Sequence, residues 1–138
     1  MKAIRISQYG GPDVLTLEEI ARPEPSEGVL RIKIEAAGLN FIDTYHRTGL
    51  YPLNLPLTLG MEGAGTVDAV GKNTAGFRIG DRVAWKSVPG SYADFVLAKP
   101  SDVVRIPDQV ETRTAAAAML QGLTAHYLSH STYPLGEQ

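Results

Sequence analysis

Side chains that could carry chemistry concentrate in one short segment, residues 40–47. It holds an amide (Asn40), a carboxylate (Asp43), a phenol (Tyr45) and a guanidinium (Arg47). If Asn40 begins a helix, then Asn40, Asp43 and Arg47 share one face, because positions three and four apart are neighbours on a helix. Two interpretations remain open. The segment is a polar cluster at a cleft, or a surface helix with an Asp43–Arg47 pair that contributes roughly 0.2–0.5 kcal/mol.

Two further polar residues, Tyr51 and Glu62, carry the same ambiguity. Each is either part of a site or a core group whose hydrogen bonds are satisfied inside the protein. His46 is expected to be a surface or loop-packing residue.

Metal ligands and thiol nucleophiles are scarce in this chain. It contains no cysteine, which excludes thiolate chemistry and cysteine-bound zinc. His126 and His130 lie four apart on an expected helix, but no third ligand is near them and no glutamate follows His126 as in the metalloprotease motif. We therefore expect no metal site.

The glycine-rich segment at 60–71 is not a nucleotide-binding loop. A dinucleotide fingerprint needs Gly-x-Gly-x-x-Gly between a strand and a helix. Here Gly63 and Gly65 are followed by Thr66, Val67 and Asp68, a pattern that favours a strand. The glycines are better explained by a bent barrel strand, since glycine within a strand marks a bulge or a close backbone approach.

Charge and hydropathy exclude several partners. Lys plus Arg number 13 and Asp plus Glu 15, for a net charge of −2. Such a balance makes a poor binder of nucleic acid. Apolar runs stay below the roughly 18 residues that cross a bilayer, so we expect no membrane partner. Residues 1–5 alternate rather than form a signal peptide, which predicts a cytoplasmic protein.

Many short elements are expected, because 14 Gly and 9 Pro are spread along the chain. This favours a barrel or sandwich. Strands are predicted at 2–7, 14–21, 29–36, 60–71, 82–85, 91–97 and 103–106. Residues 111–130 are helical by propensity, with a break or close packing at Gly122. Leu120, Leu123 and Tyr127 fall on one face of that helix. The predicted division is 1–110 for the barrel and 111–138 for the helical segment.

Taken in order, several motifs resemble the N-terminal, GroES-like catalytic domain of the medium-chain dehydrogenase/reductase superfamily, and most closely its zinc-free, zeta-crystallin-like quinone oxidoreductases. The motifs are Gly-Gly-Pro-Asp-Val-Leu at 10–15, Ala-Gly-Leu-Asn-Phe-Ile-Asp-Thr-Tyr at 37–45, Gly-Leu-Tyr-Pro at 49–52, Gly-x-Glu-x-x-Gly at 60–65, Gly-Asp-Arg-Val at 80–83 and Gly-Leu-Thr-Ala at 122–125. The resemblance implies a mainly β (α+β) fold: a partly open GroES-like β-barrel with short helices and a C-terminal helical segment.

The resemblance also implies a chemistry. Zinc-dependent members carry cysteine where Asn40 stands and histidine where Met61 stands, so metal-free reduction of a quinone or enone by NADPH is expected. The implied catalytic residues are Asn40, Asp43, Tyr45 and Tyr51. Asn40 and Thr124 are implied to contact the cofactor, with Met119 and Gln121 as further candidates.

Family members continue into a nucleotide-binding domain whose fingerprint these 138 residues lack. We therefore expect the chain alone to be inactive, and its uncovered apolar surface to favour a homo-oligomer. Two alternatives compete with the enzymatic interpretation. One is a GroES-like binding or assembly module without catalysis, and the other is a truncated, self-associating product. The polar set at Asn40, Asp43, Tyr45 and Tyr51 favours the enzyme.

Overall fold

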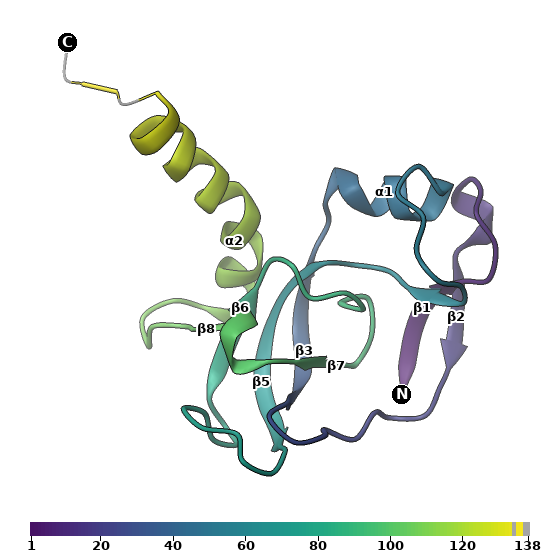
Figure 1. The fold of residues 1–138 in the computed structure, drawn as a ribbon, viewed down its shortest axis with the longest axis horizontal. Helices are drawn as coiled ribbons and strands as arrows, with labels where there is room; N and C mark the ends of the chain where they lie inside the picture. The colour runs from purple at the N-terminus through teal and green to yellow at the C-terminus, as the bar shows by residue number, and fades with distance from the viewer. Residues whose placement is uncertain (134, 137–138) are drawn as a thin grey trace.

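The computed structural model describes residues 1–133 and 135–136, whose strands form two antiparallel sheets (Figure 1). The smaller sheet has the order β2-β1-β4 and the larger β7-β3-β5-β6-β8. The strands are β1 (Lys2–Ile6), β2 (Thr16–Glu19), β3 (Leu30–Gly38), β4 (Leu57–Thr58), β5 (Glu62–Val70), β6 (Arg82–Trp85), β7 (Phe95–Ala98) and β8 (Val104–Arg105). Within these residues the sheets do not close into a full barrel, so the predicted partly open, mainly β fold is confirmed.

Helical elements are few in the described residues. They comprise α1 (Phe41–Thr48), α2 (Thr112–Tyr127), two 3₁₀ turns at Pro12–Val14 and Pro100–Asp102, and a π-helical turn at Leu128–Thr132. The strand predicted at 14–21 is shorter than expected, because a 3₁₀ turn occupies its first residue. Residues 134, 137 and 138 of the predicted helical segment lie outside the described residues, and the division at 110 stays a prediction.

The long pair β3–β5 confirms that the glycines at 60–71 serve a bent strand. Its register shifts twice, between Arg31 and Ile32 and between Ile34 and Ala36. A Cβ on Gly65 would collide with the main-chain carbonyl of Lys33 on the facing strand. Glycine therefore lets two backbones approach more closely than any other residue would allow.

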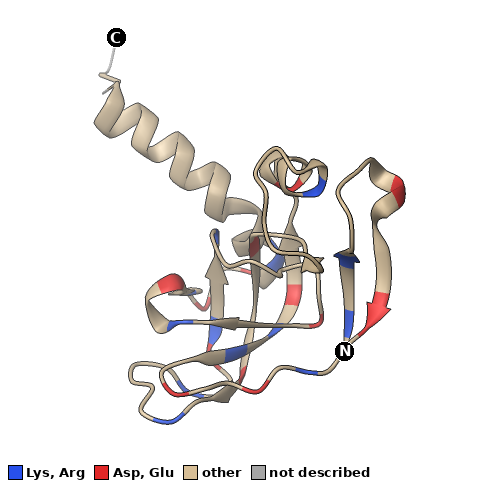
Figure 2. Cartoon of the chain, turned by 45° about the vertical axis from the view of Figure 1, so that its right-hand side comes forward, with Lys and Arg blue, Asp and Glu red and all other residues tan. Residues whose placement is uncertain are grey.

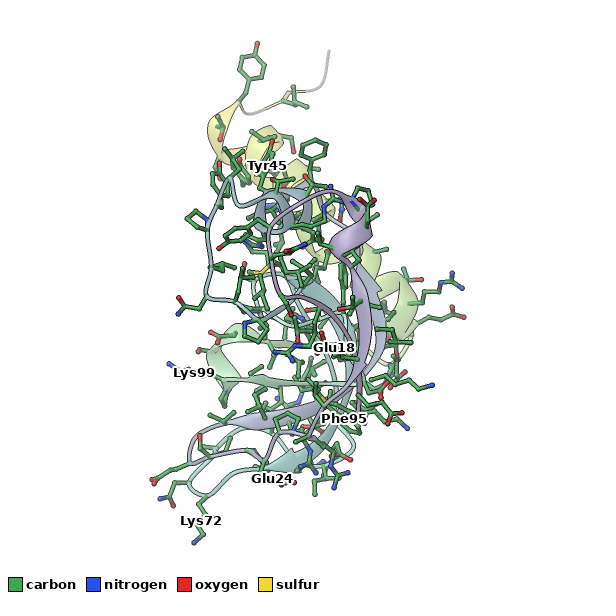
Figure 3. All side chains as sticks on the ribbon, turned by 90° about the vertical axis from the view of Figure 1, so that its right-hand side faces the viewer. Glu18, Glu24, Tyr45, Lys72, Phe95 and Lys99 are labelled. Carbon is green, nitrogen blue, oxygen red and sulfur yellow. The ribbon has the colours of Figure 1, made fainter. Side chains whose placement is uncertain are left out.

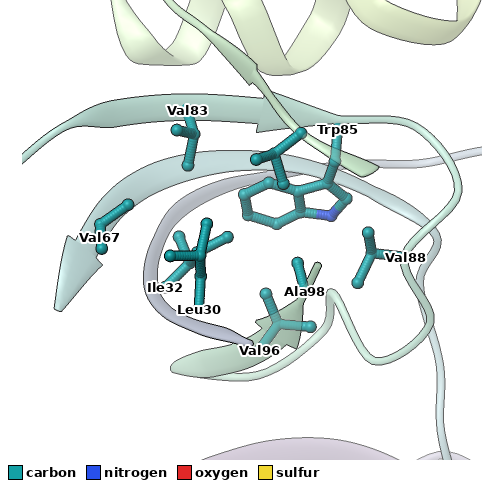
Figure 4. Close-up of a cluster of buried hydrophobic side chains, with 9 residues drawn as sticks. Leu30, Ile32, Val67, Val83, Trp85, Val88, Val96 and Ala98 are labelled. Atoms are coloured by element: carbon teal, nitrogen blue, oxygen red, sulfur yellow. The ribbon is translucent and has the colours of Figure 1, made fainter. Parts of the chain in front are cut away.

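One apolar cluster fills the space inside the larger sheet (Figure 4). Alternate residues of β3 point into it, as the period-2 pattern requires, and β5 contributes Val67. Trp85 is fully buried, and its indole N–H donates to Ser91 Oγ at 2.8 Å. The main members are Leu30, Ile32, Val67, Val83, Trp85, Val88, Val96, Ala98 and Val103.

Helix α1 follows directly from β3 and lies across one end of the fold beside the β1–β2 hairpin (Figure 1). Tyr45, which it carries, stands at that end (Figure 3). Asn40 has extended backbone angles and precedes the first turn, as predicted for an N-cap. Gly49 ends the helix with φ of 80°, a left-handed conformation that favours glycine.

Helix α2 is anchored to the rest of the domain through its first half, up to Gln121. Ala116 is buried against Ala64, Ala84 and Ile106 of the sheet and its flank. Toward its C-terminal end the helix projects away from the strands (Figure 1). The projecting part contains no Lys, Arg, Asp or Glu among the described residues (Figure 2).

The sequence-based expectation for Gly122 is wrong. Helix α2 runs through it without a break, and a Cβ built on it meets nothing within 4 Å, so it is not closely packed either. The alanine- and leucine-rich neighbours on both sides favour helix strongly enough to include one glycine.

We expect Gly122→Ala to stabilise the chain by about 0.5–1 kcal/mol, because alanine loses less backbone entropy in a helix and has room here. Urea unfolding followed by circular dichroism measures the change. Gly38→Ala is the contrasting variant and should destabilise, since its Cβ would meet the Glu62 carboxylate. A lower stability for Gly122→Ala would show that this position is packed in solution.

Candidate functional site

Asn40 stands where β3 turns into α1, and it is nearly buried. Its main-chain N–H donates to Asp43 Oδ2 at 2.9 Å. This is half of a capping box, in which a side chain three residues into the helix reaches back to the residue before it. The cap fixes the backbone of Asn40, and its side-chain amide also reaches groups outside the helix.

Glu62 is the most deeply buried charged side chain of this region, with 0% exposure. Its Oε2 accepts from Asn40 Nδ2 at 2.7 Å, and its Oε1 accepts from the main-chain N–H of Leu120 at 2.6 Å. Gly38 faces Glu62 across the β3–β5 register, and a side chain there would occupy the space of the carboxylate. The glycine therefore makes room for a buried acid.

Asp43 is also buried, and a tyrosine that the sequence analysis did not identify holds it. Tyr92 donates its hydroxyl proton to Asp43 Oδ2 at 2.6 Å. Burial, the hydrogen bond to Asp43 and the charges of Asp43 and Glu62 raise the pKa of Tyr92. The phenol is therefore a firm donor to Asp43. No motif singles out Tyr92, because the strand β7 that begins just after it is remote from α1 in sequence.

The ion pair between Asp43 and Arg47 that a surface helix would form is not among the ion pairs of residues 1–133 and 135–136. Asp43 turns inward instead, to Asn40 and Tyr92. Its Oδ1 is buried without a hydrogen-bond partner in the described part of the chain. His46, expected at the surface or packed by a loop, is buried. The structure therefore favours the interpretation of α1 as part of a polar cluster.

Helix α2 completes the cluster through Gln121, whose Nε2 donates to Asn40 Oδ1 at 3.2 Å. Asn40 thus connects α1, β5 and α2. We call the residues Tyr92, Asp43, Asn40, Glu62 and Gln121 the Asn40 network. Of the predicted cofactor contacts, Asn40 and Gln121 touch one another. Met119 packs beside Ala116, and Thr124 lies three residues beyond Gln121 on the same helix.

The Asn40 network separates two hollows. One, of about 310 Å³, is mainly apolar and includes Asp43 and Tyr92 in its wall. The other, of about 530 Å³, lies between β3 and α2 and includes Glu62 and Gln121. Arg47 also lines the first hollow, and Glu35 and Arg113 line the second, so a ligand in either hollow would meet charged as well as neutral groups.

The two phenols predicted to be catalytic, Tyr45 and Tyr51, lie together but outside the lining of these hollows. Their rings meet edge to face with centroids 5.2 Å apart, and Phe41 meets Tyr45 in the same way at 5.2 Å. Such pairs hold aromatic rings in a fixed orientation. Tyr51 is 52% exposed, so the structure brings it to Tyr45 and not to the Asn40 network.

Among the described residues, no three His, Cys, Asp or Glu side chains come together in a group that could hold a metal. His126 and His130 stack their rings 4.2 Å apart on α2. Within the same residues, no helix combines the length and the apolar character needed to cross a membrane.

Comparison with known proteins decides the family. Residues 26–108, more than half of the chain, match the alcohol dehydrogenase GroES-like domain. The chain belongs to this family. The GroES-like domain so identified contains β3, α1, β5 and Tyr92, and therefore all of the Asn40 network except Gln121.

Curated relatives of this GroES-like domain bear out the predicted resemblance. A quinone oxidoreductase of Pseudomonas aeruginosa is 46% identical over 136 residues, covering 97% of this chain and 42% of the relative. Human quinone oxidoreductase is 40% identical over 131 residues, which cover 91% of this chain and 40% of the relative. The chain thus spans about two fifths of the length of these relatives.

Solved protein structures support the same resemblance. Escherichia coli quinone oxidoreductase complexed with NADPH matches with a TM-score of 0.94 at 36% identity, covering 98% of this chain and 42% of that one. A mycobacterial protein complexed with NADPH matches with a TM-score of 0.93 at 46% identity, and the match covers 99% of this chain and 43% of that one.

Because the pKa of Tyr92 is raised above its ordinary value of 10.0, the folded chain keeps this proton when the unfolded chain loses it. The free energy of unfolding should therefore fall as pH rises past about 10. In Tyr92→Phe this part of the fall should be missing. Denaturant unfolding between pH 8 and 11 measures it, with Tyr9→Phe, which removes a more exposed hydroxyl bonded to Leu53, as the control. Equal pH dependence in Tyr92→Phe and the wild type would contradict the assignment.

Proposed function

We propose that this GroES-like domain forms the substrate side of an NADPH-dependent quinone oxidoreductase that passes hydride to a quinone or a related enone without zinc. The observation that carries the proposal is the Asn40 network, a set of oriented amide, carboxylate and phenol groups at the point where α1, β5 and α2 meet. The names of the relatives support the same substrate class.

The chemistry of the donors supports zinc independence. Zinc in proteins takes thiolate, imidazole or carboxylate ligands. The resemblance places Asn40 and Met61 where zinc-dependent members have cysteine and histidine. An amide already bonded to Glu62 and Gln121 is a poor zinc ligand, and a thioether is a softer donor than zinc usually takes.

NADPH, when bound, supplies the hydride. In the proposed enzyme its phosphates are held by a part outside these 138 residues, since the sequence has no glycine fingerprint for them. The residues of this chain fit the other end of the cofactor. The amides of Asn40 and Gln121 match a carboxamide in hydrogen-bonding capacity, and Met119 and Thr124 lie within three residues of Gln121 on α2.

The phenols of Tyr45 and Tyr51 are the proposed donors to the substrate oxygen. Oxygen gains negative charge as hydride arrives at carbon, and oriented donors stabilise that charge. The edge-to-face contacts with Phe41 and with each other hold both rings in position. Asp43 has an orienting role, because it is occupied by Asn40 and Tyr92.

In the enzyme that contains both parts, Tyr51→Phe should lower the turnover of quinone by roughly 100- to 1,000-fold, as expected for loss of one oriented donor. The affinity for NADPH should stay nearly unchanged. Steady-state NADPH oxidation measures the turnover and calorimetry measures the affinity, with Tyr9→Phe as the control. Unchanged turnover would remove Tyr51 from the mechanism, and a wild-type protein that reduces no quinone with NADPH would refute the proposed function.

We also propose that the chain by itself forms dimers or higher oligomers through the projecting part of α2. Leu123 and Tyr127 are 45% and 52% exposed there, next to the half-buried Leu120. Burying that charge-free surface against a second copy removes apolar area from water. Sedimentation equilibrium should show association that weakens in Leu123→Lys. A monomer at high concentration would contradict this.

A further inference from the structure

The Asn40 amide has two chemically different ends, and its neighbours determine which end a ligand meets. Building on the proposed function, we infer that Glu62 is a positioning residue that fixes the polarity of Asn40, so that Oδ1 is offered to a hydrogen-bond donor on the ligand. The N–H of a carboxamide fits this requirement and a bare carbonyl oxygen does not.

The argument begins with Glu62. A carboxylate oxygen accepts hydrogen bonds and cannot donate them. The contact of 2.7 Å between Glu62 Oε2 and the Asn40 side chain therefore requires the NH₂ end of the amide to face Glu62. The other oxygen of Glu62 is held by the main-chain N–H of Leu120, so the carboxylate is fixed at both oxygens. With Glu62 fully buried, water does not compete for these bonds.

The opposite end of the amide follows. Once Nδ2 faces Glu62, Oδ1 faces α2, where it accepts from Gln121 Nε2 at 3.2 Å. Gln121 is exposed, in contrast to Asn40 and Glu62, so it is the member of the trio that a ligand can displace. A group that replaces Gln121 against Oδ1 must donate. Asn40 accordingly has a different role from Tyr45 and Tyr51, which offer protons.

Replacing Glu62 by glutamine should reverse the polarity without changing the shape. The single oxygen of the new amide is needed by the Leu120 N–H, so its NH₂ faces Asn40. Asn40 must then turn its Oδ1 toward residue 62 and present Nδ2 to α2. Gln121 can follow by turning its own amide, so Glu62→Gln is expected to fold.

A double-mutant cycle with Gln121→Glu tests this reversal. In the wild-type background a carboxylate at 121 faces the oxygen of Asn40 and loses the hydrogen bond. In the Glu62→Gln background the carboxylate at 121 faces the NH₂ of Asn40 and gains a hydrogen bond. Gln121→Glu should therefore raise the equilibrium constant for unfolding by about fivefold in the first background and by less, or not at all, in the second. Gln8→Glu, at an exposed site far in sequence, should show no such coupling.

Nuclear magnetic resonance of the 138-residue chain reads the polarity directly. In the wild type the Asn40 side-chain NH₂ protons should show nuclear Overhauser contacts to Glu62 and slow exchange with water. In Glu62→Gln these contacts should shift to Gln121. An Asn40 amide whose NH₂ faces Gln121 in the wild type, or equal effects of Gln121→Glu in both backgrounds, would overturn the inference.

Two small probes of nearly equal shape separate this inference from the proposed function. Nicotinamide carries a donating carboxamide, and 3-acetylpyridine carries only an accepting ketone. Nicotinamide should shift the Asn40 and Gln121 resonances more strongly in the wild type, and this preference should vanish in Glu62→Gln. Equal shifts by both probes in the wild type would overturn the inference. If the contacts within the network are as expected and neither probe shifts any resonance, the polarity assignment stands and the proposed cofactor role of this chain fails.

Discussion

The arrangement of this site depends on one buried charge, the carboxylate of Glu62. A charged group removed from water is costly unless hydrogen bonds replace its hydration. Two donors do so here, the Asn40 side chain and the Leu120 main-chain N–H. They belong to different elements, so satisfying one carboxylate sets the position of α2 against β5 and of the first turn of α1 against both. Gly38, on the facing strand, leaves the space that this arrangement needs.

Asp43 is a second buried carboxylate whose hydration is replaced by hydrogen bonds from the protein. It is buried, and it takes its donors from the Asn40 main chain and from Tyr92. Asn40 therefore serves both acids, through its main chain on one side and its side chain on the other. A residue bound in this way has little freedom to rearrange, which suits a group that must orient a ligand rather than take part in bond making.

Helix α2 contrasts with this rigid centre. Its first half is held by the sheet and by Glu62, whereas its second half leaves the body of the domain and carries no Lys, Arg, Asp or Glu (Figures 1 and 2). Gln121 lies where the anchored part gives way to the projecting part. It is the residue of the Asn40 network best placed to exchange an internal hydrogen bond for one with a ligand.

Much of the architecture was determined by the sequence alone. The alternating pattern of β3, the glycine-spaced strand β5 and the N-cap at Asn40 are local properties of backbone and side chain, and all were predicted. The motif order also predicted the family. Local propensity failed at Gly122, where the flanking residues outweighed one glycine. Only the tertiary structure decided the partners of the polar residues. Tyr92 reaches Asp43 across 49 positions and Glu62 reaches Leu120 across 58, and no local pattern encodes such contacts. They arise because packing the strands removes these groups from water, and each must then find its hydrogen bonds on whichever element the fold brings beside it.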